Sequence, residues 1–384
     1  MGDTNRVQLS MLAESTYGVL PSGDFSILRF TSESLKQVTR TTKSAEIRAD
    51  RQIPSIVRTG VSGSGSIGIE LSYGAHDTLL QYALMSAGWS SPVTVTAATI
   101  SAASADNSFN DSGSGFGSIV AGQWIKVRGF ANAANNGYFK VVSKTSAKLV
   151  VSGGTLVTAA ASPTITVKMG AQIVNGVTGT SFTIERKYGD LTNTFAALFG
   201  CMVDKFSLNA AAEAITTGSF DLILAREESA SSAPSGGGYD DAPNNPVMNA
   251  VDDLPQIWLN QALIPATAVS LSLANNLRGR MEIDNVGPVS IGSGTCDISG
   301  TLEQYFTSPT LIDLYLAFTA FSLAWCQEDA LGNSYVIEIP QARFVDGQRP
   351  ATGQNADVMT PLQWNVERHA TQDIMIRITR FAAA

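Results

Sequence analysis

The fold is decided by a stretch of sequence that occurs twice. Residues 66–84 read SIGIELSYGAHDTLLQYAL, and residues 298–316 read ISGTLEQYFTSPTLIDLYL. At a constant offset of 232 the two stretches share five identical residues, among them Gly68 with Gly300. Each follows a Gly-Ser-Gly turn and changes from strand-like alternation to a helical period. We therefore interpret the chain as two copies of one α+β unit.

The segments around this repeat predict a mainly β protein. Most of them alternate apolar and polar residues, which is the period of a half-buried strand. Helices are predicted from Asp77 and from Ser308–Pro309, where residues suited to an N-cap and a first turn precede apolar residues. A third helix is predicted over Leu191–Phe199, before Gly200. Strands are predicted at residues 25–30, 67–73, 181–186, 219–224 and 374–379.

Two segments of different composition interrupt the repeated unit. Residues 92–170 are rich in Ala, Ser, Thr, Val and Gly, and an Asn-Asn-Gly turn signal at 135–137 separates two short strands. This pattern predicts a small inserted all-β domain. Residues 227–256 are rich in Ser, Gly, Pro and Asp, which predicts a flexible acidic linker loop. The remaining ranges are the first unit, 1–91 with 171–226, and the second unit, 257–384.

The chain is acidic and poor in charged residues. It has 384 residues with 25 Lys or Arg and 33 Asp or Glu, a net charge of −8. Only 15% of its residues are charged, compared with about 25% in typical soluble domains. The predicted insertion carries +4, which leaves −12 on the rest of the chain. We interpret the low charge as surface hidden in a polymer, and the acidic balance does not suit binding of nucleic acid through its phosphates.

Neither export nor membrane insertion is predicted. The N-terminus lacks the basic start and apolar run of a secretory signal. The longest apolar run, Leu311–Trp325, is interrupted by Asp313 and is shorter than the roughly 20 residues of a membrane helix. The three cysteines show no C-x-x-C spacing, so we expect free thiols in a reducing compartment rather than a disulfide framework.

A search for catalytic chemistry predicts no enzyme, no metal site and no cofactor. The chain has two histidines, His76 and His369, and an ordinary turn residue is the favoured interpretation of His76. Residues 63–68 match G-x-G-x-x-G, but they lead into a strand rather than a helix, so the dinucleotide interpretation is rejected. Acidic residues on the predicted strands could pair as acid and base, although a solvated sheet face is favoured.

Several motifs together resemble a known family. They are Glu14–Pro21 with Leu28–Thr31, Ser44–Arg51, Gly68, Glu70 and Leu71 before the Asp77 helix, Phe182–Glu185 with Gly200–Val203 and Phe206–Leu208, and Val269–Leu273 with Asn275–Arg278. As a set they resemble the siphovirus tail tube proteins, the major tail proteins of long non-contractile phage tails, in the branch whose tube fold is duplicated. The resemblance covers essentially all of the chain outside the insertion and the linker.

The resemblance implies a structural virion protein. Each unit would be a packed pair of β-sheets, a sandwich or barrel, with a short flanking helix. Its rings would stack into the tail tube that conducts genomic DNA from capsid to host. If a single-copy relative makes hexameric rings, a duplicated chain would need three subunits for the same pseudo-sixfold ring. The implied partners are further copies of this chain, the tail terminator and the baseplate or tip proteins. The tape measure protein and then DNA would pass through the lumen without specific binding. Assembly would occur in the host cytoplasm, with no cofactor and no membrane.

Two sets of residues are predicted to serve this assembly. The acidic lumen-facing candidates are Glu46, Asp50, Glu70, Glu282 and Asp284. The candidates for contacts between rings are Glu14, Tyr17, Asp240, Asp241, Arg380 and Phe381. Two alternatives stay open at this point. The chain could be a secreted carbohydrate-binding or adhesin-like β protein, which would need a signal peptide. The insertion could bind the host surface or only act as a spacer.

Overall fold

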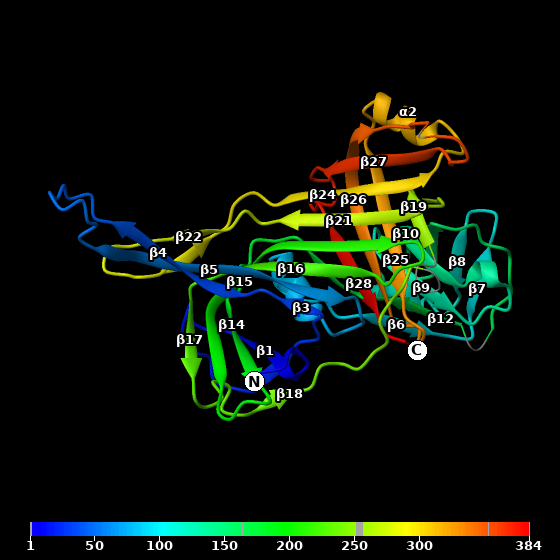
Figure 1. The fold of residues 1–384 in the computed structure, drawn as a ribbon. Helices are drawn as coiled ribbons and strands as arrows, with labels where there is room; N and C mark the ends of the chain where they lie inside the picture. The colour runs from blue at the N-terminus through cyan, green and yellow to red at the C-terminus, as the bar shows by residue number, and fades with distance from the viewer. Residues whose placement is uncertain (1, 163–164, 251–255, 352, 384) are drawn as a thin grey trace.

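A computed structural model describes residues 2–162, 165–250, 256–351 and 353–383. Within these ranges the chain is mainly β, with twenty-eight strands and two α-helices, which confirms the predicted class (Figure 1). Helix α1 spans Asp77–Ala83 and helix α2 spans Thr310–Leu316, both where the sequence predicts them. No helix among these residues is long and apolar enough to cross a membrane.

The helix predicted over Leu191–Phe199 is wrong. Its second half begins strand β15 (Phe195–Ala211), and residues 196–203 are buried on both faces of that strand. A strand buried on both faces shows a continuous apolar run that cannot be distinguished from a buried helix by its period. Gly200 does not cap a helix. It has φ +62° within β15, where a Cβ would lie 2.8 Å from Cζ of Tyr17.

Eight antiparallel strands form one continuous run across both predicted units. Their order is β4-β5-β16-β15-β21-β24-β27-β26. The link between the two halves is the pairing of β15 with β21. The strands not yet placed are β4 (Lys36–Lys43), β5 (Ile56–Glu70), β16 (Thr217–Leu224), β21 (Ala268–Ala274), β24 (Asp297–Tyr305), β26 (Ser334–Gly347) and β27 (Met359–Val366).

The two halves of the chain have the same strand order. The first half pairs β1 (Val7–Ala13), β14 (Phe182–Tyr188), β15, β16, β5 and β4 in succession. The second half pairs β19 (Gln256–Leu259), β25 (Phe321–Glu328), β26, β27, β24 and β21. Register shifts also occur at matching places, between β14 and β15 as between β25 and β26, and between β15 and β16 as between β26 and β27.

The strands match at a different offset from the helices. The register shift in β15 follows Val203. Val203 lies opposite Leu222 of β16, and Leu222 lies opposite Gly65 of β5. The register shift in β26 follows Phe344. Phe344 lies opposite Trp364 of β27, and Trp364 lies opposite Gly300 of β24. Gly65 is therefore the counterpart of Gly300, and the sequence match of Gly68 with Gly300 puts residues of opposite sheet faces together. An odd register error always does so, because side chains alternate between faces.

Residues 93–169 form a separate seven-stranded sheet with its own core of apolar side chains. Its strands are β6 (Val93–Thr96), β7 (Ile100–Ala103), β8 (Ser108–Asp111), β9 (Trp124–Arg128), β10 (Gly137–Lys144), β11 (Lys148–Ser152) and β12 (Thr166–Met169). Strands β9 and β10 pair as the turn signal predicts. Their connection, residues 129–136, is longer than a two-residue turn, and within it Asn135 is buried and bonds the backbone of Val157.

The described part of the predicted linker lies against the first half of the chain. Strand β17 (Arg226–Ala230) pairs with β15, and β18 (Tyr239–Asp240) pairs with β2 (Phe25–Ile27). Met248 is fully buried. Backbone pairing thus holds a segment that composition alone predicts to be flexible. Residues 251–255 of the predicted linker, among them Asp252 and Asp253, lie outside the described residues.

Two hairpins extend together beyond the body of the molecule (Figure 1). One is β4 and β5 with the connecting residues 44–55, and the other is β22 (Arg278–Arg280) with β23 (Ser290–Gly292). The Val61 N–H donates to Val286 O at 2.7 Å, which joins the hairpins near their base. We call residues 36–58 with 278–292 the arm. The remaining strands are β3 (Ser32–Glu33), β13 (Ala171–Val174), β20 (Ala262–Leu263) and β28 (Arg377–Phe381).

Candidate assembly surfaces

The outer face of the eight-stranded run carries rows of hydroxyl and amide side chains. The opposite face places Ile67, Phe220, Phe206 and Leu273 in the core. The registers align one outer row as Gly68, Ser219, Ser207, Ser272, Ser299 and Asn365. They align a second row as Glu70, Thr217, Asn209, Ser270, Thr301 and Gln363. Hydroxyls bond across strands, with 2.9 Å between Ser207 and Ser219. We call this surface the polar face.

Charges of both signs are spread over the polar face. Asp221 and Lys205 are cross-strand neighbours, so opposite charges lie side by side. By strand alternation, the acidic residues on the face are Glu70, Asp221, Asp297, Glu303 and Asp346, and the basic residues are Lys36, Arg40, Lys205 and Arg343. Uncharged polar groups outnumber the charged ones in the aligned rows.

The predicted lumen-facing residues fall into two places. Glu70 lies on the polar face at the end of β5. Glu46 and Asp50 lie in the connection between β4 and β5, while Glu282 and Asp284 lie in the connection between β22 and β23. All four are exposed on the arm. Arg48 donates to Asp50 at 2.8 Å, and this contact lowers the pKa of the Asp50 carboxyl.

Two of the predicted inter-ring residues have partners inside the chain. Glu14 accepts bonds at 2.8 Å from the backbone N–H of Gly18, the hydroxyl of Thr183 and the backbone N–H of Gly200. The ring of Tyr17 packs against Gly200, and burial raises the pKa of its hydroxyl. These contacts hold the N-terminal turn on the first half of the chain.

The predicted C-terminal contact residues are also used internally. Phe381 is fully buried. Arg380 pairs with Asp77 and lies over the ring of Trp89, with 4.4 Å from its guanidinium carbon to the ring centroid. Tyr335 donates to the same Asp77 carboxylate at 2.5 Å. The last strand is therefore anchored to α1. Of the six candidates, Asp240 and Asp241 remain exposed, at β18.

The arm is the exposed surface that sequence reasoning missed. Ile47 and Ile283 are fully exposed at its two connections. Residues 36–58 hold six basic and two acidic side chains, a net charge of +4 in a protein of net charge −8. The signal was present in the sequence as Lys and Arg recurring along one hairpin. The acidic total of the whole unit conceals it.

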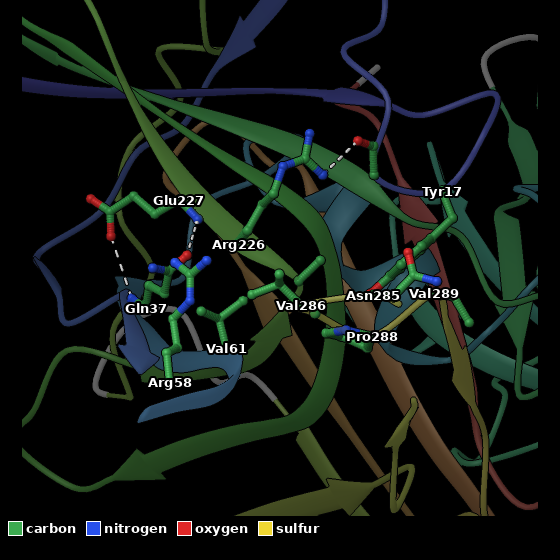
Figure 2. A pocket seen from close by; sticks show the side chains of 13 residues that line it. Tyr17, Gln37, Arg58, Val61, Arg226, Glu227, Asn285, Val286, Pro288 and Val289 are labelled. Atoms are coloured by element: carbon green, nitrogen blue, oxygen red, sulfur yellow. Dashed lines mark hydrogen bonds between the residues drawn. The ribbon is translucent and has the colours of Figure 1, made fainter. Parts of the chain in front are cut away.

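A cavity of about 600 Å³ lies where the arm joins the body (Figure 2). Arg58, Arg226 and Val286 are among its lining residues. Gln37 and Glu227 bond reciprocally here, because the Glu227 N–H donates to Gln37 Oε1 at 3.0 Å and the Gln37 N–H donates to Glu227 Oε2 at 3.4 Å. Side-chain contacts rather than sheet pairing therefore hold the outer edge of β4.

One strand edge is open in the second half. Past Ala342, β26 pairs with β27 on one side, and among the described residues no strand pairs with its other side. At the corresponding position of the first half, β15 uses that side to pair with β21. An open edge offers N–H and C=O groups to another strand.

The seven-stranded sheet is fastened to the second half by buried charges. Glu338, which is 2% exposed, accepts bonds from Lys140 at 2.5 Å, from Arg377 at 2.9 Å and from Trp124 Nε1 at 3.1 Å. Trp124 also packs on Trp258, with 4.5 Å between ring centroids. Glu328 binds two further basic side chains of the sheet. All six basic residues of the segment, Lys126, Arg128, Lys140, Lys144, Lys148 and Lys168, bond to partners within the chain.

Neither the histidines nor the cysteines form a reactive cluster. His76 is buried, with Nε2 2.9 Å from Arg29 O, and burial lowers the pKa of its imidazole. Cys201 and Cys326 are buried free thiols whose pKa is raised by burial. Over the part of the chain that is described, no group of three or more His, Cys, Asp or Glu side chains could hold a metal ion.

A mainly β chain with an open strand edge, a projecting arm and a continuous polar face has the features of a structural subunit. A family model described as "Phage tail tube protein" matches residues 4–366. The chain belongs to this family, which confirms the prediction of a phage tail tube protein and makes it a structural component of the virion. No curated protein sequence matches the chain. The carbohydrate-binding alternative has no support from this match.

Proposed function

We propose that the chain polymerises into stacked homotrimeric rings that form the DNA conduit of a long, non-contractile siphovirus tail. The observation that carries the proposal is the shared strand order of the two halves, including their register shifts. On this interpretation each chain supplies two copies of one tube unit, so three chains give a ring with six units. Assembly takes place in the host cytoplasm, and tail terminator, tip and tape measure proteins are the expected partners.

The pairing of β15 with β21 serves as the template for the contact between subunits. Inside the chain, Lys205 lies opposite Ala274. Matching the register shifts makes Asp346 the counterpart of Lys205, and matching β5 with β24 makes Val38 the counterpart of Ala274. In the ring, Asp346 of one subunit thus lies opposite Val38 of the next. This head-to-tail contact closes the ring and removes both open edges.

Charge favours this register. Lys36 and Arg40 flank Val38 on the same face of β4, so Asp346 would have a basic side chain on each diagonal. The Gln37 N–H would pair with Gly347 of the next subunit. Inside the chain it donates to Glu227 Oε2 at 3.4 Å. That contact is long for a hydrogen bond and is readily exchanged for a strand contact.

The polar face would line the lumen. Proteins hold DNA by clustering Lys and Arg against its phosphates. The hydroxyl rows offer no such cluster, and Lys205 on this face has Asp221 as its cross-strand neighbour. Rings would stack through the arm, because its basic hairpin and exposed isoleucines suit the acidic body of a second copy. Outside the arm and the seven-stranded sheet, the chain carries a net charge of −16.

Electron microscopy of the purified protein tests the assembly, and disulfide trapping tests the register. The variant Val38→Cys/Asp346→Cys should form covalent trimers on mild oxidation of assembled rings. The control Thr42→Cys/Asp346→Cys moves the thiol by four residues, about 13 Å along the strand, and should not cross-link. Rings of six whole chains would overturn the trimer. Equal cross-linking in both variants would overturn the register.

A further inference from the structure

A cluster of basic and hydroxyl side chains lies on one face of the seven-stranded sheet. Strands β6, β12 and β9 are neighbours, and their registers align Thr94 with Lys168 and Lys126. The next aligned row is Thr96, Thr166 and Arg128. The six side chains therefore form two adjacent rows on one surface, with three cations grouped at one end and hydroxyls at the other.

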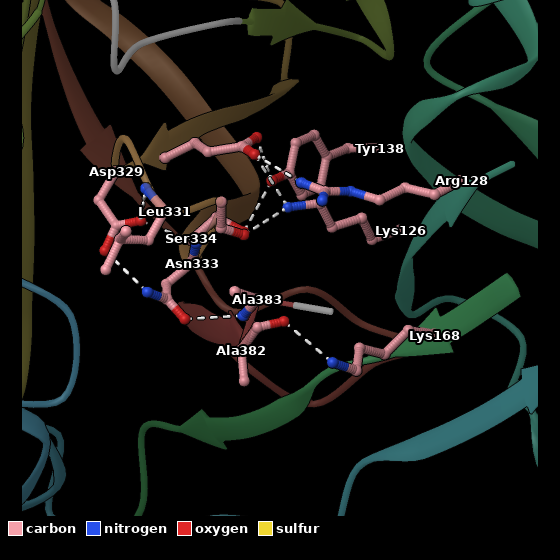
Figure 3. Close-up of polar contacts among 12 residues, drawn as sticks. Lys126, Arg128, Tyr138, Lys168, Asp329, Leu331, Asn333, Ser334, Ala382 and Ala383 are labelled. Carbon is pink, nitrogen blue, oxygen red and sulfur yellow. Dashed lines mark hydrogen bonds and ion pairs between the residues drawn. The ribbon is translucent and has the colours of Figure 1, made fainter. Parts of the chain in front are cut away.

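This arrangement of cations is unfavourable without an anion. Lys168 and Lys126 lie directly opposite each other, and like charges in that position repel. Glu328 accepts from Lys126 at 3.1 Å and from Arg128 at 2.8 Å, so one carboxylate serves two cations. Lys168 donates at 2.9 Å to Ala382 O, which carries no charge (Figure 3). Among the described side chains, the cluster therefore holds three positive charges against one negative charge.

Both lysines of the cluster have a lowered pKa. Burial and the neighbouring Arg128 lower the pKa of Lys168. Burial also lowers the pKa of Lys126, with Glu328 opposing that effect and Arg128 adding to it. Both shifts follow from the geometry, in which basic groups are crowded and partly desolvated.

The cluster borders a cavity of about 470 Å³ that a small ligand could enter. Thr94 and Thr96 are exposed at its rim, whereas the Lys126 side chain is 5% exposed. The Thr96 and Thr166 hydroxyls are 3.0 Å apart, each able to donate or accept. The described lining residues thus combine an excess of positive charge with adjacent hydroxyls.

We propose that this cavity binds a phosphoryl group carried on a polyol or sugar. A phosphate monoester carries nearly two negative charges at neutral pH, which matches the excess charge of the cluster. Lys168 and Arg128 bind the phosphoryl oxygens, and the Thr94, Thr96 and Thr166 hydroxyls bind those of the polyol. The site uses none of the residues assigned above to contacts between subunits or rings, and it would give the seven-stranded sheet a ligand of its own.

Calorimetric titration of the full chain with glycerol 3-phosphate and with inorganic phosphate tests the site. Sodium chloride at the same ionic strength is the blank. Saturable binding of glycerol 3-phosphate is expected, with affinity above that of inorganic phosphate. Lys168→Met should weaken both at least about tenfold, because it removes a charge-assisted hydrogen bond. The matched control is Lys144→Met, whose ammonium group donates to Gly117 O and does not line the cavity.

Each outcome decides a part of the proposal. Absence of saturable binding, or equal loss in Lys168→Met and Lys144→Met, would overturn the site. Equal affinities for the two phosphates would overturn the polyol part, and Thr96→Val checks it separately. That variant should weaken glycerol 3-phosphate and leave inorganic phosphate unchanged. The melting temperature of each variant without ligand shows whether it is folded.

Discussion

Replacing Glu338 with alanine should detach the seven-stranded sheet from the second half of the chain. The Glu338 carboxylate is 2% exposed and is bound by Lys140 at 2.5 Å and by Arg377 at 2.9 Å. These two side chains are 10% and 9% exposed. The substitution would therefore leave two buried cations without their anion and would also orphan the Trp124 indole N–H.

The expected cost follows from that geometry. Breaking a buried ion pair by removing one partner costs about 3–5 kcal/mol, since the remaining charge stays desolvated. With an unfolding entropy of about 2.1 cal/mol/K per residue, such a loss lowers Tm by about 4–6 °C if the chain unfolds as one unit. A sheet that separates first would instead give an early transition of its own.

Differential scanning calorimetry and urea denaturation measure this effect. The matched control is Glu228→Ala, which removes an exposed carboxylate bound by Arg226 at 2.6 Å. Exposed pairs of this kind contribute about 0–1 kcal/mol, so the control should change little. If Glu338→Ala cost no more than the control, the buried ion pairs would not be what joins the sheet to the body.

Four further outcomes are expected. Gly200→Ala should lower the free energy of unfolding measured in urea by about 1–3 kcal/mol, because φ is +62° and the Tyr17 ring fills the Cβ position; an unchanged urea midpoint would contradict this. Burial lowers the pKa of His76 below its ordinary 6.5. The stability that the neutral imidazole contributes is therefore present above pH 6.5 and is lost as the pH falls toward the pKa of the folded state. In His76→Asn the urea midpoint should change less between pH 7.5 and pH 5.5 than in the unaltered protein. Ile47→Asp/Ile283→Asp should leave single rings by electron microscopy, and long tubes would refute the role of the arm. Ser272→Lys should make assembled tubes retain labelled DNA at low salt; equal release from both proteins would refute a lumen lined by the polar face.

The candidate site could be predicted only in part. The sequence motifs were enough to predict a phage tail tube protein, because the motifs of a family survive as local patterns. Of the residues predicted for ring contacts, Glu14 and Phe381 have partners inside the chain, whereas Asp240 and Asp241 are exposed. Burial of a charged or aromatic side chain depends on strands far away in sequence, and no local pattern carries that information.

The local sequence determined the mainly β class and the position of both helices, because the period of apolar residues and the capping residues act within a few positions. Tertiary structure alone decided which face each strand residue occupies. The repeat of Gly68 and Gly300 is correct as a sequence match, yet pairing through β16 and β27 makes Gly65 the counterpart of Gly300. It also decided that Lys140 meets Glu338, 198 positions away. Register and ion pairing are settled between distant strands, where a shift of one residue reverses every side chain.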